Sequence, residues 1–337
     1  MRIRSRYLLT RILQAVLVVA ITYLLTYWVL FALPGDPVAN RLDNPQNPVP
    51  PSQAQAIIEY YHLDDPALVQ FLLTVGRLFQ GDLGYSLGTG RAVSDLILQG
   101  LGSTLLLALA ALGVAALLAV SVAALAVFAP WEPVRSLARL VPALSLATPS
   151  FLIGLLLLQI FSYQLGWVSS LDTESPASLI LPALTLGIGA SPAITQVLIQ
   201  GLTEAHQRPF VKVLRSRGLS PGTIASRHVF RNGSLPALTL LALTIADLIA
   251  GSVIVESVFH RAGLGYVTEQ AVRSQDSPIV LAVVLLVSSL YSLINLVTDL
   301  LYPVIDPRIS LAESRLGSGS SASRTLQPAA PERSVTP

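Results

Sequence analysis

Long apolar stretches, separated by charged segments, dominate the pattern of this chain. Five stretches contain no charged residue and a sixth contains one acid: residues 12–33, 96–131, 140–171, 175–203 and 277–298, and residues 232–255 with Asp247. A hydrocarbon core about 30 Å thick needs roughly 20 apolar residues per helix, so each stretch is long enough to cross a membrane. The pattern predicts an all-α membrane protein with six transmembrane helices.

The segments outside the spans differ in character. Residues 1–11 precede the first span at residues 12–33, and the segment of residues 34–95 is too long to be a plain turn. Within it, helices are expected from Ser52 and from Pro66 to about Phe79. The remaining five spans lie within residues 96–309. The tail of residues 310–337 is rich in Ser, Pro and Ala, a composition typical of disorder.

The loop between spans four and five, residues 204–235, carries local signals for a first helix. Residues 204–217 can form that helix, and Gly218 stands where a left-handed C′ residue would end it. Leu219 is available for the apolar contact that accompanies such a helix end. The first half of this loop is therefore predicted to be a helix that begins near Glu204 and stops at Gly218.

A second helix is predicted immediately afterwards. Ser220 and Pro221 suit the N-cap and first position of a helix that continues to about Arg231. The α-helical spacing places two pairs on shared faces: Ile224 with His228, and Ala225 with Val229. The loop is thus expected to be a compact helix–turn–helix on the membrane surface.

Composition supports the membrane assignment. The 337-residue chain is 53% apolar and 12% charged, with a mean hydropathy of +0.65. These values fit a protein with several membrane spans better than a soluble domain. The absence of cysteine excludes disulfides, cysteine-ligated zinc and iron–sulfur clusters.

The distribution of charge predicts the orientation. If the N-terminus is cytoplasmic, 16 of the 21 basic residues fall in cytoplasmic segments, whereas the loop of residues 166–178 contains none. Basic residues near span ends are usually retained in the cytoplasm. Both termini and the loop of residues 204–235 are therefore expected on the cytoplasmic side.

Three interpretations compete for the basic loop of residues 204–235. Its charge could simply fix topology or contact anionic lipid, at about 1 kcal/mol per basic residue near the surface. It could dock a cytoplasmic partner, which would also explain the ordered turn residues around Gly218 and Pro221. Nucleic acid is a poor third candidate between two membrane spans. The residues alone leave the first two interpretations open.

Several segments together resemble one family. These are "VLRSRGLSPGTIASRHVFRNGSLPALT", "YLLTRILQAVLVVAITYLLTYWVLFALPGDP", "HLDDPALVQFLLTVGRLFQGDLGYS", "ESVFHRAGLGYVTEQAVRSQDSPIV" and "NLVTDLLYPVIDPRI". In order and spacing they resemble the ABC importer permeases of the dipeptide/oligopeptide/nickel group, along nearly the whole chain to Ile309. Pro209 departs from the family, which usually has an acid near this position.

The resemblance implies a type I ABC importer transmembrane domain in the bacterial cytoplasmic membrane. It implies a homologous second permease, two cytoplasmic ATPase subunits that bind ATP and Mg²⁺, and an extracytoplasmic solute-binding protein. This chain needs no cofactor of its own. It has no P-loop, because its only lysine, Lys212, follows Val211 rather than glycine.

In this family the cytoplasmic loop inserts a short coupling helix into the ATPase. Thirteen positions are carried over as ATPase-coupling residues: Glu204, Lys212, Arg215, Arg217, Gly218, Leu219, Ser220, Pro221, Ile224, His228, Arg231, Asn232 and Pro236. Membrane lipid is expected around the spans, and nucleic acid is not an expected partner.

Polar residues within the spans are candidates for the translocation path or its gates, because burying a charge in the bilayer costs at least about 2.5 kcal/mol. Asp247 lies near the middle of span five and could either line the path or hydrogen-bond between helices. Asn295 and Asp299 lie four apart on span six, where a structural or gating role is expected. Glu256, with the nearby "RAGLG", is a candidate for the external gate.

Other candidate sites are weak. "GYSLG" at residues 84–88 matches the G-x-S-x-G nucleophile pattern, but that motif needs a strand before it, and a helix-like segment precedes it here. The four histidines, His62, His206, His228 and His260, fall outside the predicted spans and form no H-E-x-x-H. Neither a catalytic nor a metal site is predicted.

Peptides are the expected cargo, with nickel, a metallophore or another small solute as alternatives. A bare transition metal would find few ligands in a path without Cys or intramembrane His. A partner-independent secondary transporter is the rival from another class. Such proteins often show inverted repeats, and the sequence shows no convincing repeat.

Overall fold

The computed structural model describes residues 5–32, 51–62, 65–168 and 175–305. Within these residues the chain is helical apart from turns and one isolated antiparallel bridge between Tyr85 and Ala92. Five helices are long and apolar enough to cross a membrane, and a sixth span exists if a bent pair of helices is counted as one. The prediction of an all-α protein is confirmed over the described residues, with five to six candidate spans.

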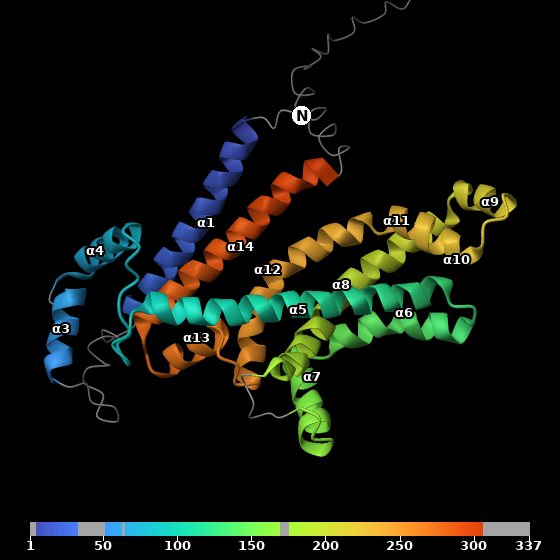
Figure 1. Ribbon diagram of the computed structural model, residues 1–337. Helices are drawn as coiled ribbons and strands as arrows, with labels where there is room; N and C mark the ends of the chain where they lie inside the picture. The colour runs from blue at the N-terminus through green and yellow to red at the C-terminus, as the bar shows by residue number, and fades with distance from the viewer. Residues whose placement is uncertain (1–4, 33–50, 63–64, 169–174, 306–337) are drawn as a thin grey trace, which may run out of the picture.

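Five of the predicted spans correspond to one long helix each: α1 (Ser5–Ala32), α5 (Val93–Phe128), α8 (Ile180–Gln207), α12 (Leu235–Val258) and α14 (Ser277–Ile305). Figure 1 shows α1 and α14 running side by side, while α5, α8 and α12 cross one another.

The core forms where α5 packs along α8. Four alanines at every fourth position of α5 are completely buried: Ala111, Ala115, Ala119 and Ala123. On α8, a Cβ added at Gly187 would lie 2.8 Å from the carbonyl oxygen of Ala111. Small residues let helix backbones approach closely in membranes, where lipid is as apolar as the side chains. Helices α5 and α8 therefore pack closely against each other, and α12 packs against both.

The third predicted span, residues 140–171, is not one continuous helix. It divides into α6 (Glu132–Ala147), α7 (Ser150–Leu157) and the π-helical turn η1 (Leu158–Gln164), with a bend of 102° between the first and the last two. Thr148 is extended (φ −103°, ψ 119°) because it precedes Pro149. The expectation of an uninterrupted span is corrected: α6 lies along α5, and after the bend α7 packs against α8 and α12.

Short helices occupy the end of the bundle opposite the loop of residues 204–235. They are α3 (Pro51–Tyr61), α4 (Ala67–Phe79) and α13 (Leu264–Arg273). Pro66 stands at the N-cap of α4 rather than at its first helical position. Figure 1 shows α4 beside the end of α1, where the rings of Phe71 and Tyr27 meet edge to face at 4.9 Å. The predicted tail of residues 310–337 lies outside the described residues.

Candidate functional site: the basic helical loop and the polar residues of the spans

The loop begins with a break that the sequence analysis missed. Residues 204–217 do not form one helix, because α8 ends at Gln207 and a new helix, α9 (Pro209–Ser216), follows. Arg208 is extended (φ −66°, ψ 148°) between them. The ring of Pro209 disfavours the helical conformation for the residue before it. The proline therefore turns the chain out of the membrane helix α8 and starts α9 in a new direction.

Helix α9 is amphipathic. Val211 is buried, with 3% of its surface exposed, and Phe210 and Leu214 pack against the apolar cluster that α5 and α8 share. Lys212 and Arg215 lie on the exposed face. The apolar side therefore fixes α9 to the transmembrane core, while its basic side is exposed.

The end of α9 has the predicted glycine stop. Gly218 has φ +78°, its backbone N–H donates to the carbonyl of Arg215 at 3.0 Å, and that of Leu219 donates to the carbonyl of Leu214 at 3.2 Å. This pair of hydrogen bonds is a Schellman motif, which needs a left-handed residue at the Gly218 position. Leu214 and Leu219 pack against the same apolar cluster. The local prediction of a glycine-terminated helix is confirmed.

The second helical segment begins at the predicted N-cap and then changes from an α-helix to a π-helical turn. The Oγ of Ser220 accepts a hydrogen bond from the backbone N–H of Thr223 at 3.2 Å. The segment consists of α10 (Pro221–Thr223), the π-helical turn η3 (Ile224–Val229) and α11 (Phe230–Gly233). Ser220 thus caps the segment as expected, but its middle is not α-helical.

The π-helical turn corrects the predicted side-chain pairs. Ile224 and Val229, five residues apart, are the buried pair at 1% and 0% exposure, whereas His228 is half-buried. A π-helical turn closes its hydrogen bonds over five residues instead of four. The α-helical pairing of Ile224 with His228 was therefore wrong, and the buried face belongs to Ile224 and Val229.

A glycine pair joins this segment to α8. A Cβ added at Gly233 would lie 2.6 Å from the carbonyl oxygen of Gly201, and one added at Gly201 would collide with the backbone of Gly233. The backbones of α11 and α8 thus touch without intervening side chains. Ser234 follows, and its N–H donates to the carbonyl of Phe230 at 2.9 Å. Helix α11 therefore lies directly against α8 and leads into the start of α12.

From Arg208 onward, every exposed charged side chain of the loop is basic. Six basic side chains are exposed there: Arg208, Lys212, Arg215, Arg217, Arg227 and Arg231. No acid occurs from residue 205 to residue 246. The guanidinium of Arg215 lies 3.3 Å from Nε2 of His206, and among the described residues these six cations form no ion pair. The surface is suited to a partner that is acidic.

The remaining predicted coupling residues lie at the edges of this surface. Glu204 is exposed on the last turns of α8 and accepts a hydrogen bond from Gln200 at 3.1 Å. Asn232 donates from Nδ2 to the carbonyl of His228 at 2.8 Å, which supports the π-helical segment. Pro236 is exposed in the first turn of α12. The structure therefore brings the thirteen predicted coupling residues into one contiguous region.

Asp247 lies in the middle of α12, and its side chain is exposed at the surface of this chain. No hydrogen bond or ion pair joins its carboxylate to another described residue. Among the described residues, Asp247 thus does not make the hydrogen bond between helices that the sequence left open. A carboxylate is costly to expose to hydrocarbon, so the role of Asp247 in the translocation path stays a prediction that this exposure does not contradict.

Asn295 is partly buried on α14 and donates from Nδ2 to the carbonyl of Tyr291 at 3.0 Å. It lines a cavity of about 160 Å³ between α1 and α14, together with Arg11 and Gln14. Asp299 also belongs to α14, but its side chain lies outside the described residues. The position of Asn295 favours a structural role between two spans.

Glu256 is completely buried near the end of α12. Its Oε1 accepts a hydrogen bond from Thr104 of α5 at 2.6 Å, and its Oε2 accepts one from the backbone N–H of Gly265 at 2.6 Å. The same Thr104 hydroxyl accepts from the N–H of Leu264 at 2.9 Å. Side chains at Gly263 or Gly265 would collide with this carboxylate. Glu256 therefore does not line an open path; it ties α5, α12 and α13 together.

Thr104 is the functional residue that sequence reasoning missed here, because nothing local marks it as the partner of a residue 152 positions away. The glycines of "RAGLG" were a usable signal. Their lack of Cβ atoms makes room for the Glu256 carboxylate.

The "GYSLG" segment is a structural turn. Ser86 is buried and donates from Oγ to Oδ2 of Asp276 at 2.6 Å, and that carboxylate oxygen also accepts from the N–H of Gly88 at 3.1 Å. The segment follows α4 rather than a strand. Ser86 therefore anchors this loop to the start of α14 and lacks the strand–turn–helix setting of a nucleophile.

Comparisons with known proteins converge on one class. A family model described as "Binding-protein-dependent transport system inner membrane component" matches residues 126–311. The chain is 30% identical over 316 residues to the oligopeptide transport system permease protein AppB of Bacillus subtilis (strain 168), covering 90% of this chain and 99% of that protein. It is 32% identical over 308 residues to the glutathione transport system permease protein GsiC of Salmonella paratyphi A, covering 90% and 98%.

Proposed function

Because this chain belongs to the binding-protein-dependent transport system inner membrane component family, we propose that it forms half of the translocation path of an ATP-driven importer of peptides. Membership makes it a multi-pass permease subunit of a bacterial inner-membrane ABC importer, which is not itself catalytic. Transporters of this kind work with an ATPase and a binding protein.

The loop formed by α9, α10, η3 and α11 faces the cytoplasm in this proposal. Its six exposed basic residues support this orientation, because positive charge near span ends is retained inside. Both termini then lie on the cytoplasmic side, and α3, α4 and α13 lie outside. The two ATPase subunits, with their ATP and Mg²⁺, approach from the loop side, and the solute-binding protein approaches from the α13 side.

One observation carries the proposed coupling role: the loop is both exposed and rigidly joined to the spans. The cluster around Val211, Ile224 and Val229 holds its apolar side, and the contact between Gly201 and Gly233 leaves no side chain to absorb a displacement. Packed elements transmit movement because they are not continuously deformable. When the ATPases close, a push on this loop is therefore passed directly to α8 and α12.

Asp247 supports a path between this chain and a homologous second permease. It is exposed in the middle of α12, where a lipid-facing position would leave a charge in hydrocarbon. The peptide cargo is supported by the relatives, one of which is an oligopeptide permease and another a glutathione permease. Alternating access then moves the cargo while this chain makes and breaks no covalent bond.

The test targets the glycine contact. Gly233→Ala forces a methyl group toward the Gly201 carbonyl and re-aims α11, so ATP hydrolysis should continue while uptake falls. A loss of 0.5–2 kcal/mol of coupling corresponds to roughly 2- to 30-fold less uptake per ATP. Gly222→Ala is the matched control, because a Cβ at Gly222 meets nothing within 4 Å. Uptake and hydrolysis are measured on the complete transporter in proteoliposomes. Unchanged uptake per ATP in Gly233→Ala would contradict the coupling role.

A further inference from the structure

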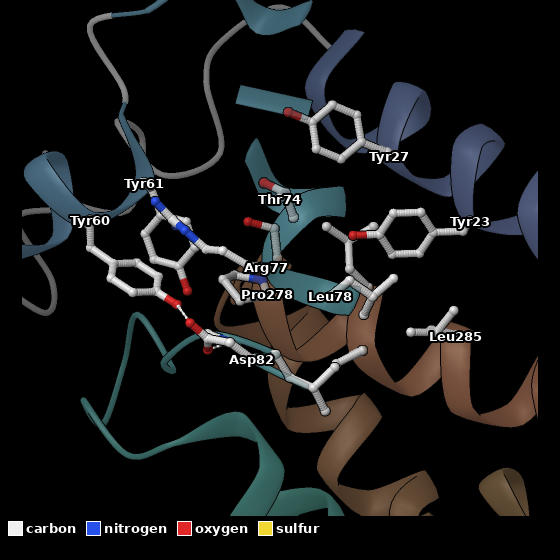
Figure 2. Close-up of a pocket in the computed structure, with 15 residues that line it drawn as sticks. Tyr23, Tyr27, Tyr60, Tyr61, Thr74, Arg77, Leu78, Asp82, Pro278 and Leu285 are labelled. Carbon is white, nitrogen blue, oxygen red and sulfur yellow. Dashed lines mark hydrogen bonds between the residues drawn. The ribbon is translucent and has the colours of Figure 1, made fainter. Parts of the chain in front are cut away.

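Helix α4 turns its polar side chains toward the rest of the protein. Gln70 is buried and donates from Nε2 to the carbonyl of Asp65 at 2.8 Å, and the Thr74 hydroxyl donates to the carbonyl of Gln70 at 2.8 Å. The guanidinium of Arg77 lies 4.2 Å from the ring centre of Tyr60. Figure 2 shows Thr74 and Arg77 among the tyrosines of α1 and α3. The three polar side chains of α4 are therefore engaged within the protein.

The opposite face of α4 is exposed and entirely apolar. Six residues form it: Leu68, Val69, Leu72, Leu73, Gly76 and Phe79. Leu68 and Leu72 are 62% and 60% exposed, and Phe79 is 87% exposed. A helix at the surface of a soluble domain has the reverse arrangement, with its polar residues outside. A contiguous exposed apolar surface marks contact with a membrane or with another protein.

The inner face of α4 contacts two membrane spans close to their ends. One apolar cluster contains Phe71, Val75 and Leu78 of α4, Tyr23 and Tyr27 of α1, and Leu281 of α14. Tyr27 lies three residues before the end of the span Leu9–Leu30, and Leu281 lies four residues after the start of the span Ser277–Val297. These offsets correspond to roughly 5–6 Å along a helix. Helix α4 therefore lies at the depth of the last turns of both spans.

The part of α1 beside α4 also exposes apolar side chains. Leu25 and Val29 are 59% and 61% exposed. Trp28 is 50% exposed and lies two residues before the end of its span. Tryptophan is enriched at the boundary between hydrocarbon and head groups. The exposed face of α4 is thus at the level of a membrane boundary, next to the apolar surface of a membrane span.

The length of α4 excludes a crossing of the membrane. Its 13 residues extend about 20 Å, whereas the hydrocarbon core is about 30 Å thick. An interfacial helix lies in the plane of the membrane, with its apolar face about 5–10 Å inside the head-group boundary, which agrees with the depth of the cluster. A protein interface fits less well, because it carries about one hydrogen bond per 100–200 Å², and this face offers no side-chain donor or acceptor.

We propose that α4 is an interfacial helix whose exposed face lies among the acyl chains of the leaflet at the α13 end of the permease. Its polar side supports α3 and the turn after α4, where the Tyr60 hydroxyl donates to Oδ2 of Asp82 at 2.6 Å. The partner of this surface is the lipid leaflet. The membrane thereby fixes the level of the segment between α1 and α5, and in the orientation proposed above this is the outer leaflet.

The test measures the depth of α4 with spin labels. The chain contains no cysteine, so an introduced cysteine is its single labelling site. Leu72→Cys and Phe79→Cys label the apolar face, and Glu59→Cys labels an exposed position on α3 as the water-facing control. The complete transporter is placed in lipid nanodiscs, and the spectrum of the unmodified transporter, treated in the same way, is subtracted. Collisions with oxygen and with a water-soluble nickel chelate, calibrated with doxyl-labelled lipids, give each depth.

We expect both α4 labels at about 5–10 Å below the membrane surface and the Glu59→Cys label outside it. Nickel collisions as frequent as those of Glu59→Cys would place the face in water and overturn the proposal. An immobilised spectrum with few collisions of either kind would also overturn it, because a protein would then cover the face. Elution volume and substrate-stimulated ATP hydrolysis verify that each variant is folded. Leu68→Cys lies on the same face and replaces a variant that does not fold.

Discussion

Replacement of Gly218 tests whether the basic loop needs its backbone conformation to bind the ATPase, or only its positive charge. Gly218 has φ +78°, and a Cβ built on it meets no atom within 4 Å. Any cost of a side chain there is therefore backbone strain and not collision. For an L-residue the left-handed conformation costs about 1–2 kcal/mol, and a β-branched side chain tolerates it least. We expect Gly218→Val to weaken the Schellman turn between α9 and α10.

The strain converts into a measurable loss of ATPase binding. In the free permease, the variant loop can relieve the strain by unwinding the end of α9. In the complex, the loop must form the turn again. The strain energy therefore reduces the free energy of ATPase binding. A cost of about 1–2 kcal/mol lowers the association constant roughly 5- to 30-fold. Gly218→Asn should lose less, because Asn visits the left-handed region more readily. The expected order of ATPase affinity, from highest to lowest, is Gly, Asn and Val at position 218.

The assay is the dissociation constant of the purified ATPase for the permease in nanodiscs, together with substrate-stimulated hydrolysis. Gly222→Val is the control, because Gly222 is also exposed, has open space around it and does not have a positive φ. Normal affinity and normal stimulated hydrolysis in Gly218→Val would refute the docking argument. In that case the loop's charge, tested by neutralising Arg215, Arg217, Arg227 and Arg231 together, would be what matters.

Two further predictions concern the spans. Asp247→Asn should lower uptake at limiting substrate with little change in complex assembly, because the carboxylate is exposed in the middle of α12 and bonds to no other described residue; unchanged uptake, measured with radiolabelled peptide, would remove Asp247 from the path. Gly265→Ala should destabilise the permease by at least about 1–3 kcal/mol, since its Cβ would collide with the Cα of Val253 on α12 and lie 2.9 Å from Oε2 of Glu256, whose buried hydrogen bond it would displace. Thermal unfolding compares it with Gly102→Ala, where a Cβ meets nothing within 4 Å, and equal midpoints would contradict the importance of the close contact between α13 and α12 around Glu256.

Local signals in the sequence were sufficient for five of the six predicted spans and for the turn of the basic loop. Within a bilayer the backbone must satisfy its own hydrogen bonds, so an apolar stretch of sufficient length has few alternatives to forming a helix. Gly218 and Ser220 act through their own backbone and their nearest neighbours, and both were placed correctly. The break at Pro209 follows the same local rule, and the sequence contained the signal for it.

The bend at Pro149 is different, because prolines are also tolerated inside membrane helices when neighbouring groups satisfy the freed backbone. Pro149 keeps Thr148 out of the helix, but the sequence alone did not show that the span would turn by 102° with α6 packed against α5 and α8. Periodicity likewise predicted Ile224 with His228, whereas tertiary burial selected Ile224 with Val229 through a π-helical turn.

The contacts that hold the helices of this permease together join residues that are far apart in the chain. Gly201 meets Gly233, Thr104 meets Glu256, and Tyr23 shares a cavity with Arg77 and Leu281. Composition and spacing set which segments become helices, because helix formation depends on neighbours within one or two turns. Which faces of those helices touch depends on the fit of side chains across the whole bundle, and that fit exists only once the helices have assembled.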